Sequence, residues 1–392
     1  MNPDFLYGIL NLDFWGCALA AFVMVQFTFL AVTLFLHRDA THRSLDLHPV
    51  LRHVFRFWLW MSSGILTREW VAVHRKHHAR CETPDDPHSP VIFGLKKVLL
   101  EGAELYQAQA RNPETLEKYG RGAPDDWIER NLYSRHRNLG IAIMVVADLA
   151  LFGIPGITIL AVQMLANPLM AAGVINGIGH YYGYRNFECP DAARNIVPWG
   201  LIVAGEELHN NHHAFPSSAK FSIYRWEFDI GWLYIRLFQF FGLAKVLRVA
   251  PAPSHVKARK HVDLDTVRAV IVNRMHVLRD YTRHVTVPVF REQLRQTGGD
   301  ISRRVKKLLV REPVLLDAAA QSRLSEVLAR NQALKTVHEF RERLRVLWSG
   351  ANMSNEKLLQ HLKDWIAQAD ASGIKVLQEF AATLRGYAMQ PA

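Results

Sequence analysis

Three histidines fall within five positions in the stretch Gly205-Glu206-Glu207-Leu208-His209-Asn210-Asn211-His212-His213-Ala214-Phe215-Pro216. If this segment is helical, His209, His212 and His213 stand at i, i+3 and i+4 and project from one face. Neutral imidazole is a good ligand for iron, copper and zinc. A single cluster of this kind also arises by chance, so its meaning depends on whether the rest of the chain supplies matching partners.

Two more histidine groups and one polar pair precede this stretch. The first group has the spacing H-x-x-x-x-H, the second repeats H-x-x-H-H, and the polar pair lies four residues apart in an apolar segment. In chain order they are His37 and His42; His74, His77 and His78; Asn176 and His180. A polar pair inside an apolar helix indicates either a functional site or a hydrogen bond between helices. Together with the three histidines of the opening stretch, these groups hold nine histidines. That number exceeds the roughly four to six ligands of one metal ion and suits two ions, either iron or zinc.

Long apolar stretches predict an all-α integral membrane protein. A helix rises about 1.5 Å per residue, so about 20 apolar residues cross a hydrocarbon core of about 30 Å. We predict three spans, at about 12–36, 139–160 and 164–183, of which the last two form a hairpin. Two helices at about 47–66 and 230–247 are aromatic-rich but interrupted by basic residues. We expect both to be interfacial and not to span the membrane. The helix at 47–66 is expected in the interface or packed under the catalytic domain, with its basic residues facing water or headgroups.

The histidine groups constrain the topology, because all of them must reach one site on one side of the bilayer. If 47–66 crossed the membrane, the groups on either side of it would face opposite compartments, so we expect it not to cross. The hairpin then returns the chain to its starting side. Lysines and arginines in the loops on that side predict that the active site faces the cytoplasm and that the N-terminus lies outside.

The bulk composition narrows the classes of partner. The 392 residues carry a formal net charge of +11, with apolar residues concentrated before about residue 250 and charged residues after it. A basic excess suits nucleic acid or an anionic membrane face. The apolar stretches favour the membrane, so we expect no nucleic-acid partner. The three cysteines are scattered without a C-x-x-C pair, which argues against a disulfide scaffold or a cysteine zinc site.

A proline-rich segment, Pro251-Ala252-Pro253-Ser254, predicts a boundary between two domains. We expect a membrane-embedded domain over 1–250 and a soluble helical extension of unknown role over 255–392. The helices expected in the extension lie near 265–296, 315–348 and 355–385. Within it, Trp365 to Arg385 faintly resembles the C-terminal helical tails of some transposases, a likeness to which we assign no function.

Taken together, the motifs of residues 12–250 resemble the membrane fatty acid desaturases, specifically the group that contains the stearoyl-CoA and bacterial Δ9 acyl desaturases. The motifs are H-R-x-x-T-H-R-S at 37–44, H-R-x-H-H at 74–78, E-T-x-x-D-P-H at 82–88, N-x-x-x-H-x-x-G-Y-R at 176–185, G-E-x-x-H-N-x-H-H-x-F-P at 205–216 and Y-R-W at 224–226. Histidine groups alone would also admit alkane hydroxylases and sterol oxidases. The residues that flank the histidines favour the acyl desaturases.

The resemblance implies a non-haem di-iron centre with O2 as co-substrate and no catalytic residue beyond the metal centre. The implied iron ligands are His37, His42, His74, His77, His78, His180, His209, His212 and His213, and Asn176 matches the position that holds a metal-bound water. The implied reaction removes two hydrogens from adjacent methylenes and leaves a cis double bond, which we expect at Δ9. An alkyl C–H bond has no acidity for a base to exploit, so the oxidant must come from a metal. Asp39, Glu206 and Glu207 are either solvated or orient the imidazoles.

The implied partners follow from the same resemblance. No fused cytochrome or flavin motif is visible, so electrons are expected from a separate ferredoxin- or cytochrome-type donor and its reductase. The substrate is a fatty acyl chain carried as a CoA thioester or on a phospholipid, within membrane lipid. Two alternatives stay open: a fatty acyl or alkane hydroxylase on the same scaffold, and a histidine-rich metal transporter or sensor. A transporter predicts ligands near the bilayer midplane.

Overall fold

The computed structural model describes residues 6–256, 259, 261–296, 304–349 and 353–389. The chain forms two compact units, each with its own hydrophobic core. Unit 1 comprises residues 1–185 and 192–250, and unit 2 comprises residues 186–191 and 251–392.

Unit 1 is mostly helical, which confirms the helical part of the expected fold class. Its helices are α1 Phe14–Ala31, the π-helix η2 Val32–Thr41, α2 Pro49–Ser63, α3 Thr67–Arg80, α4 Pro90–Phe93, α5 Leu95–Ala110, α6 Pro113–Tyr119, the π-helix η3 Glu129–Tyr133, α7 Arg137–Phe152, α8 Pro155–Asn167, the π-helix η4 Pro168–Ile175, the 3-10 helix η5 Ile178–His180, α9 His209–Ala214 and α10 Ile230–Phe240. Short strands, which the sequence did not predict, complete the unit: β1 Leu45–Leu47 pairs antiparallel with β4 Ala244–Val246, and β2 Trp199–Gly200 pairs parallel with β3 Phe228–Asp229.

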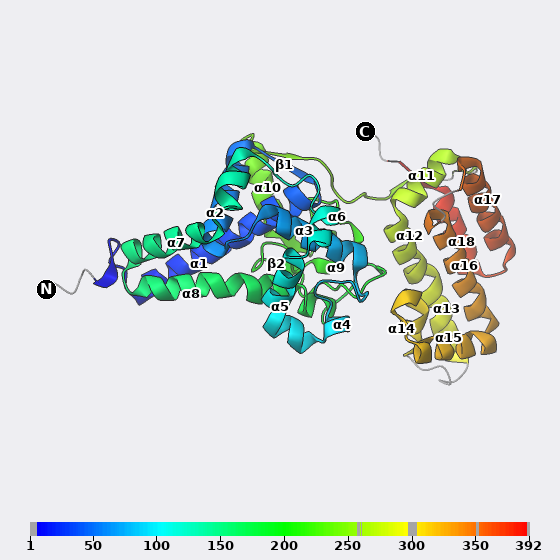
Figure 1. Ribbon diagram of the computed structural model, residues 1–392. Helices are drawn as coiled ribbons and strands as arrows, with labels where there is room; N and C mark the ends of the chain where they lie inside the picture. Colours follow the sequence, from blue (N-terminus) through cyan, green and yellow to red (C-terminus); the bar gives the residue numbers. More distant parts are fainter. Residues whose placement is uncertain (1–5, 257–258, 260, 297–303, 350–352, 390–392) are drawn as a thin grey trace. The chain divides into compact units, whose positions relative to one another are not determined.

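Two continuous helical segments of the described residues, Phe14–Thr41 and Pro155–His180, are long and apolar enough to cross a membrane. α1 and α8 pack side by side with α7 (Figure 1). Large apolar side chains stay exposed on all three helices, including those of Phe14, Trp15, Leu19, Phe22, Val146, Ile157 and Leu165. An apolar surface of this extent suits contact with lipid.

The predicted boundary inside the hairpin was wrong. Spans were expected at 139–160 and 164–183, but α7 ends at Phe152 and α8 begins at Pro155. Gly153 makes the turn with φ +64°, and a Cβ at this position would lie 2.0 Å from the carbonyl oxygen of Leu6. Proline suits the first position of the next helix because its missing N–H has no partner there in any helix.

The two predicted interfacial helices also needed correction at their ends. The helix expected at 230–247 ends at Phe240, because Gly242 turns the chain with φ +70° and residues 244–246 then form β4. The helix expected at 47–66 begins only at Pro49. Its Arg56 does not face water or headgroups. The side chain is buried, and its guanidinium pairs with Asp126 at 2.5 Å and Glu129 at 2.8 Å.

A buried ion pair joins η2 to the segment before α10. The guanidinium of Arg38 donates to both carboxylate oxygens of Asp229, at 3.1 and 3.2 Å, and to Thr33 Oγ1 at 3.0 Å. It lies 3.8 Å from the centre of the Phe221 ring. A Cβ at Gly231 would lie 2.1 Å from Arg38 Nη1, so only glycine leaves room for the pair. These contacts fix η2 against the chain that follows α9.

Unit 2 is a helical bundle around one core. Its elements are β5 Ser254–His255, α11 Leu264–Val272, α12 Arg274–Tyr281, the π-helix η6 Thr282–Thr286, α13 Val287–Gln296, α14 Val305–Val310, the 3-10 helix η7 Pro313–Leu315, α15 Ala318–Arg330, α16 Gln332–Ser349, α17 Asn355–Ala371, α18 Lys375–Arg385 and β6 Tyr387–Ala388, which pairs antiparallel with β5. Inside the core, Tyr281 Oη donates to Val337 O at 2.7 Å and Trp365 Nε1 to Phe340 O at 2.8 Å. Each helical stretch expected from the sequence is therefore present, subdivided at turns.

Replacing Asp229 by alanine should lower the free energy of unfolding by about 3–5 kcal/mol, because Arg38 is left as a buried cation without its partner. Asp46→Ala provides the control, since Asp46 is 50% exposed and its ion pair with Arg52 lies at the surface, where such pairs contribute about 0–1 kcal/mol. Chemical denaturation of the purified variants in detergent measures both. Equal stability losses in the two variants would contradict this account.

Candidate metal centre

The π-helical winding of η2 brings the first two histidines to one side. In an α-helix, five residues turn the chain about 500°, which leaves the side chains of His37 and His42 about 140° apart. A π-helix closes its hydrogen bonds from i to i+5, and His42 N donates to His37 O at 3.0 Å. The ring centres of His37 and His42 are 4.9 Å apart. The H-x-x-x-x-H spacing thus matches the winding of this helix.

Helices α3 and α9 each divide their histidines between two groups. On α3, His74 and His78 are one turn apart and share a group, while His77 joins the other. α9 is a short helix of six residues. It sends His212 to the first group and His213 to the second. Each of the two H-x-x-H-H motifs therefore contributes histidines to both groups.

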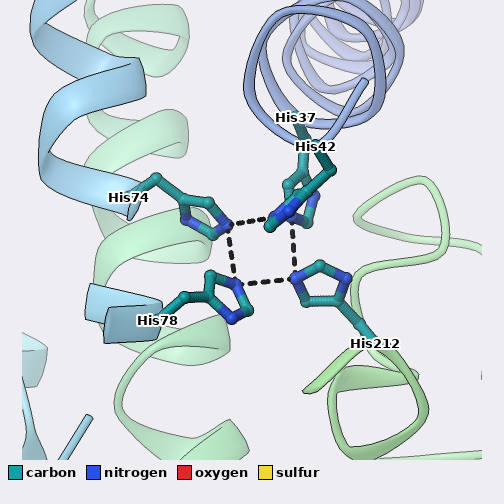
Figure 2. A group of neighbouring side chains, drawn as sticks. All are labelled: His37, His42, His74, His78 and His212. Atoms are coloured by element: carbon teal, nitrogen blue, oxygen red, sulfur yellow. Dashed lines mark hydrogen bonds between the residues drawn. The ribbon is translucent and has the colours of Figure 1, made fainter. Parts of the chain in front are cut away.

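The first group has five imidazoles whose ligand nitrogens all lie within 4.8 Å of one another (Figure 2). Its members are His37, His42, His74, His78 and His212. Neighbouring Nε2 atoms lie 3.0 Å apart between His37 and His212, 2.9 Å between His212 and His78, 3.1 Å between His78 and His74, and 3.2 Å between His74 and His42. Figure 2 shows these rings, contributed by η2, α3 and α9, turned toward a common centre.

The second group lies around His77. His77, His180, His213 and Cys81 offer ligand atoms within 4.8 Å of one another. His180 Nε2 is 2.9 Å from His209 Nε2, which connects the remaining predicted histidine to this group. The structure thus brings all nine predicted histidines together. Cys81, whose Sγ lies 3.8 Å from His77 Nε2, is a donor that sequence reasoning missed.

Three carboxylates fix the orientation of three of these imidazoles. Nδ1 lies 2.7 Å from Glu206 in His37, 2.9 Å from Asp86 in His77 and 2.9 Å from Glu82 in His180. When the Nδ1–H donates to a carboxylate, the lone pair of Nε2 is left for the opposite side of the ring. That side faces the group centres, so the carboxylates select the tautomer that can bind a cation.

Of the three acidic residues singled out from the sequence, only Glu206 contacts a histidine. Asp39 instead accepts from Arg52, at 2.5 and 2.7 Å. Glu207 accepts from the backbone N–H groups of Ile202 at 2.7 Å and Val203 at 2.8 Å. These hydrogen bonds stabilise the loop to which Glu207 itself belongs.

Glu82 and Asp86 were quoted within E-T-x-x-D-P-H, but the sequence did not assign them a role. His88, in the same motif, forms a further group with His77 and Asp86. The spacing of the motif gives no sign of these contacts, because the loop after α3 must fold back before its carboxylates meet the rings.

Burial sets the protonation of the site. It lowers the pKa of the imidazoles well below 6.5, and the neighbouring histidines lower it further, at His42, His74, His78, His209, His212 and His213. Burial alone would raise the pKa of Glu206, but the contact with His37 outweighs it and the pKa falls below 4.5. The pKa of Glu207, which has no imidazole partner, is raised by burial. These six imidazoles are therefore neutral, and the Glu206 carboxylate behind His37 is ionised.

An apolar cavity of about 530 Å³ borders the histidines. Phe29, Val73, Ala171 and Ile175 line it, while His37, His74, His209 and Asn176 close it on the side of the metal-binding groups. Polar side chains lie elsewhere on the lining: Glu69, Gln107, Arg111, Arg137 and Asn138. Asn176, at the end of η4, thus stands where the cavity meets the site. The cavity is of the size and character that an apolar chain with a polar end requires.

The comparisons with known proteins agree with the geometry. The family model described as fatty acid desaturase matches residues 13–229, and a transposase family model matches residues 258–390. A Δ9 acyl-lipid desaturase of Arabidopsis thaliana is 27% identical over 251 residues, covering 63% of this chain and 78% of the relative. The sn-1 stearoyl-lipid 9-desaturase of a Synechocystis strain is 29% identical, covering 60% and 73%. An acyl-CoA 5-desaturase of Anemone leveillei is 32% identical, covering 58% and 69%. The chain belongs to the fatty acid desaturase family, and it is an oxidoreductase that acts on acyl-lipid or acyl-CoA.

Proposed function

We propose that the two histidine groups hold two iron ions and that the chain is an O2-dependent desaturase that forms a cis double bond, at Δ9, in a saturated acyl chain. The observation that carries this proposal is the meeting of two sets of inward-facing imidazoles with an apolar cavity. The donor set is mostly imidazole, which suits iron and zinc alike. Desaturation needs a redox-active metal, and this favours iron.

The spacing of the nitrogens fits metal coordination. Two ligands about 2.1 Å from one ion and at right angles to each other are about 3.0 Å apart. The Nε2 atoms of the first group are 2.9 to 3.2 Å apart between neighbours. Hydrogen bonds between neutral imidazoles have similar distances, but a hydrogen bond joins two rings, whereas five ligand nitrogens meet here within 4.8 Å of one another. The residues therefore fit a bound cation.

The protein's own part in the reaction is to hold and position. When bound, the iron pair supplies an oxidant that is strong enough for unactivated methylene groups. The apolar lining around Phe29, Val73 and Ile175 would bury the acyl chain and exclude water, because apolar surface removed from water is favourable. Asn176 and His209 mark the place on the lining where the chain would pass the metals.

The finer assignments rest on the relatives. The Δ9 position follows the desaturases of Arabidopsis thaliana and the Synechocystis strain, and the Anemone leveillei relative acts at position 5. We further propose that the active site faces the cytoplasm, that Asn176 holds a metal-bound water, and that a separate donor supplies electrons. The apolar cavity beside the histidines argues against the transporter alternative, which needs a polar pathway.

Replacing His212 by alanine should abolish new double bonds, since it removes a donor from the middle of the first group. The measurement is gas chromatography of lipids from cells that express either chain, with iron content of the purified proteins determined alongside. Hydroxy acids without alkenes from the parent chain would identify a hydroxylase. Unchanged unsaturation with altered metal tolerance in the His212→Ala cells would favour a transporter.

Filling the cavity should stop the reaction without disturbing the metal. We expect Ala171→Trp to lower desaturation at least about tenfold, because the indole occupies space that an acyl chain needs. Leu165→Trp is the matched control on α8, where the side chain is 64% exposed and does not line the cavity. Both variants should keep their iron. Full activity of Ala171→Trp would show that the substrate lies elsewhere.

The neighbouring glutamates offer a paired test of imidazole orientation. Glu206→Gln removes the charge that holds His37, and loss of such a partner typically weakens metal affinity about 10- to 100-fold. Glu207→Gln serves as control because its contacts with the backbone of residues 202–205 do not involve a histidine. Iron affinity measured by competition with a chelator should separate the two variants, and equal affinities would refute the orienting role of Glu206.

A further inference from the structure

The positive charge of this chain is concentrated in one layer of unit 2. Residues 268–296 and 304–311 hold ten Lys or Arg but only two Asp or Glu. In contrast, residues 312–389 hold ten Lys or Arg and nine Asp or Glu, and are close to neutral. The charged segments form α12, η6, α13 and α14, together with the end of α11, and we call them the basic layer.

The basic layer has an apolar side and a cationic side. Val277, Tyr281, Val285 and Leu309 are buried in the core of unit 2. α14 packs against η6, and α12 and α13 follow one another along one edge of the unit, with α16 and α17 beyond them (Figure 1). The exposed cations Arg274, Arg283, Arg291, Lys306 and Lys307 form no ion pair with a described carboxylate.

We propose that the basic layer binds the anionic headgroups of the membrane in which unit 1 is embedded. Unit 1 exposes apolar helices of membrane-spanning length, so lipid surrounds the chain. Residues 251–263 lead directly from unit 1 to α11, and a stretch of this length spans at most about 45 Å. Unit 2 therefore cannot leave the neighbourhood of the bilayer. Clusters of four or more Lys or Arg held near an anionic leaflet are attracted to it.

Nucleic acid is the competing occupant, since residues 258–390 match a transposase family model. Two observations favour lipid. The clusters of three or more possible metal ligands in the described chain all lie between His37 and His213, so the described part of unit 2 has no such cluster to hold metal ions for cutting or joining DNA. The aromatic residues of the basic layer, Tyr281 and Phe290, are buried and cannot stack on bases.

Lysine footprinting on the whole protein tests this proposal without reference to desaturase activity. The protein is placed in nanodiscs of phosphatidylcholine, or of phosphatidylcholine with about 30% phosphatidylglycerol, and acetylated under limiting reagent. We expect modification of Lys306 and Lys307 to fall about fivefold or more with phosphatidylglycerol and to recover in about 0.5 M NaCl. Lys357 and Lys363, exposed on α17, are the internal reference and should not change.

A charge-reversal variant provides the second measurement. In the parent chain, phosphatidylglycerol should change the rate at which trypsin cleaves the segment 251–263. The variant with Arg283→Glu, Lys306→Glu and Lys307→Glu should lose this dependence, whereas the variant with Lys357→Glu and Lys363→Glu should keep it. Identical footprints in both kinds of nanodisc would overturn the proposal. Protection of Lys306 and Lys307 by added duplex DNA, but not by phosphatidylglycerol, would overturn it in favour of nucleic acid.

Discussion

The winding of η2 is the constraint on which the metal centre of this chain depends. The first two histidines follow a long apolar helix, and an α-helix would point His37 and His42 in different directions. The π-helix between Val32 and Thr41 returns the chain to nearly the same direction after five residues. A π-helix is normally unfavourable, so its stability must come from elsewhere. The fully buried ion pair between Arg38, inside this segment, and Asp229 ties the segment to the chain after α9. The histidines that the winding aims and the arginine that holds it thus lie in the same stretch of chain, whereas the arginine's partner lies 191 residues further on.

The same logic explains why burial and charge act together at the site. Burial penalises the cationic form of an imidazole and lowers the pKa of His42, His74, His78, His209, His212 and His213, so these six rings are neutral. Neighbouring Nε2 atoms lie about 3 Å apart, and the carboxylates behind His37, His77 and His180 orient these rings by accepting their Nδ1–H groups. Burial alone would raise the pKa values of Glu206, Glu82 and Asp86, and the contact of each carboxylate with its imidazole is the largest of the causes that lower them instead. Removing the imidazole would therefore raise the pKa of its carboxylate partner.

Much of the architecture could be predicted from the sequence, and the failures have physical causes. The long helices of unit 1 could be predicted from apolar stretches, because a helix suited to lipid leaves a strong hydropathy pattern in the sequence. The end of α7 was missed because hydropathy continues through Gly153, and only the left-handed backbone there makes the turn. All nine histidines were identified from their spacing and the resemblance. Glu82 and Cys81 were not, since their approach to the rings depends on how the loop after α3 folds back, and loop conformation leaves no periodicity to read. Glu207 was a false candidate because adjacency in sequence to His209 says nothing about which backbone groups its carboxylate meets.

Metal binding and folding should be coupled in this chain. The first group joins η2, α3 and α9, three segments that are separate in the sequence. In the unfolded chain these imidazoles are solvated and separate, so a cation that binds them together stabilises only the folded arrangement. A cation bound at the centre of the first group would accept lone pairs from its five imidazoles, which already meet there. Both groups take histidines from α3 and α9: His74, His78 and His212 belong to the first group, and His77 and His213 to the second. A cation in the first group would therefore hold these helices in the position that the second group requires, and the binding of two ions would be cooperative.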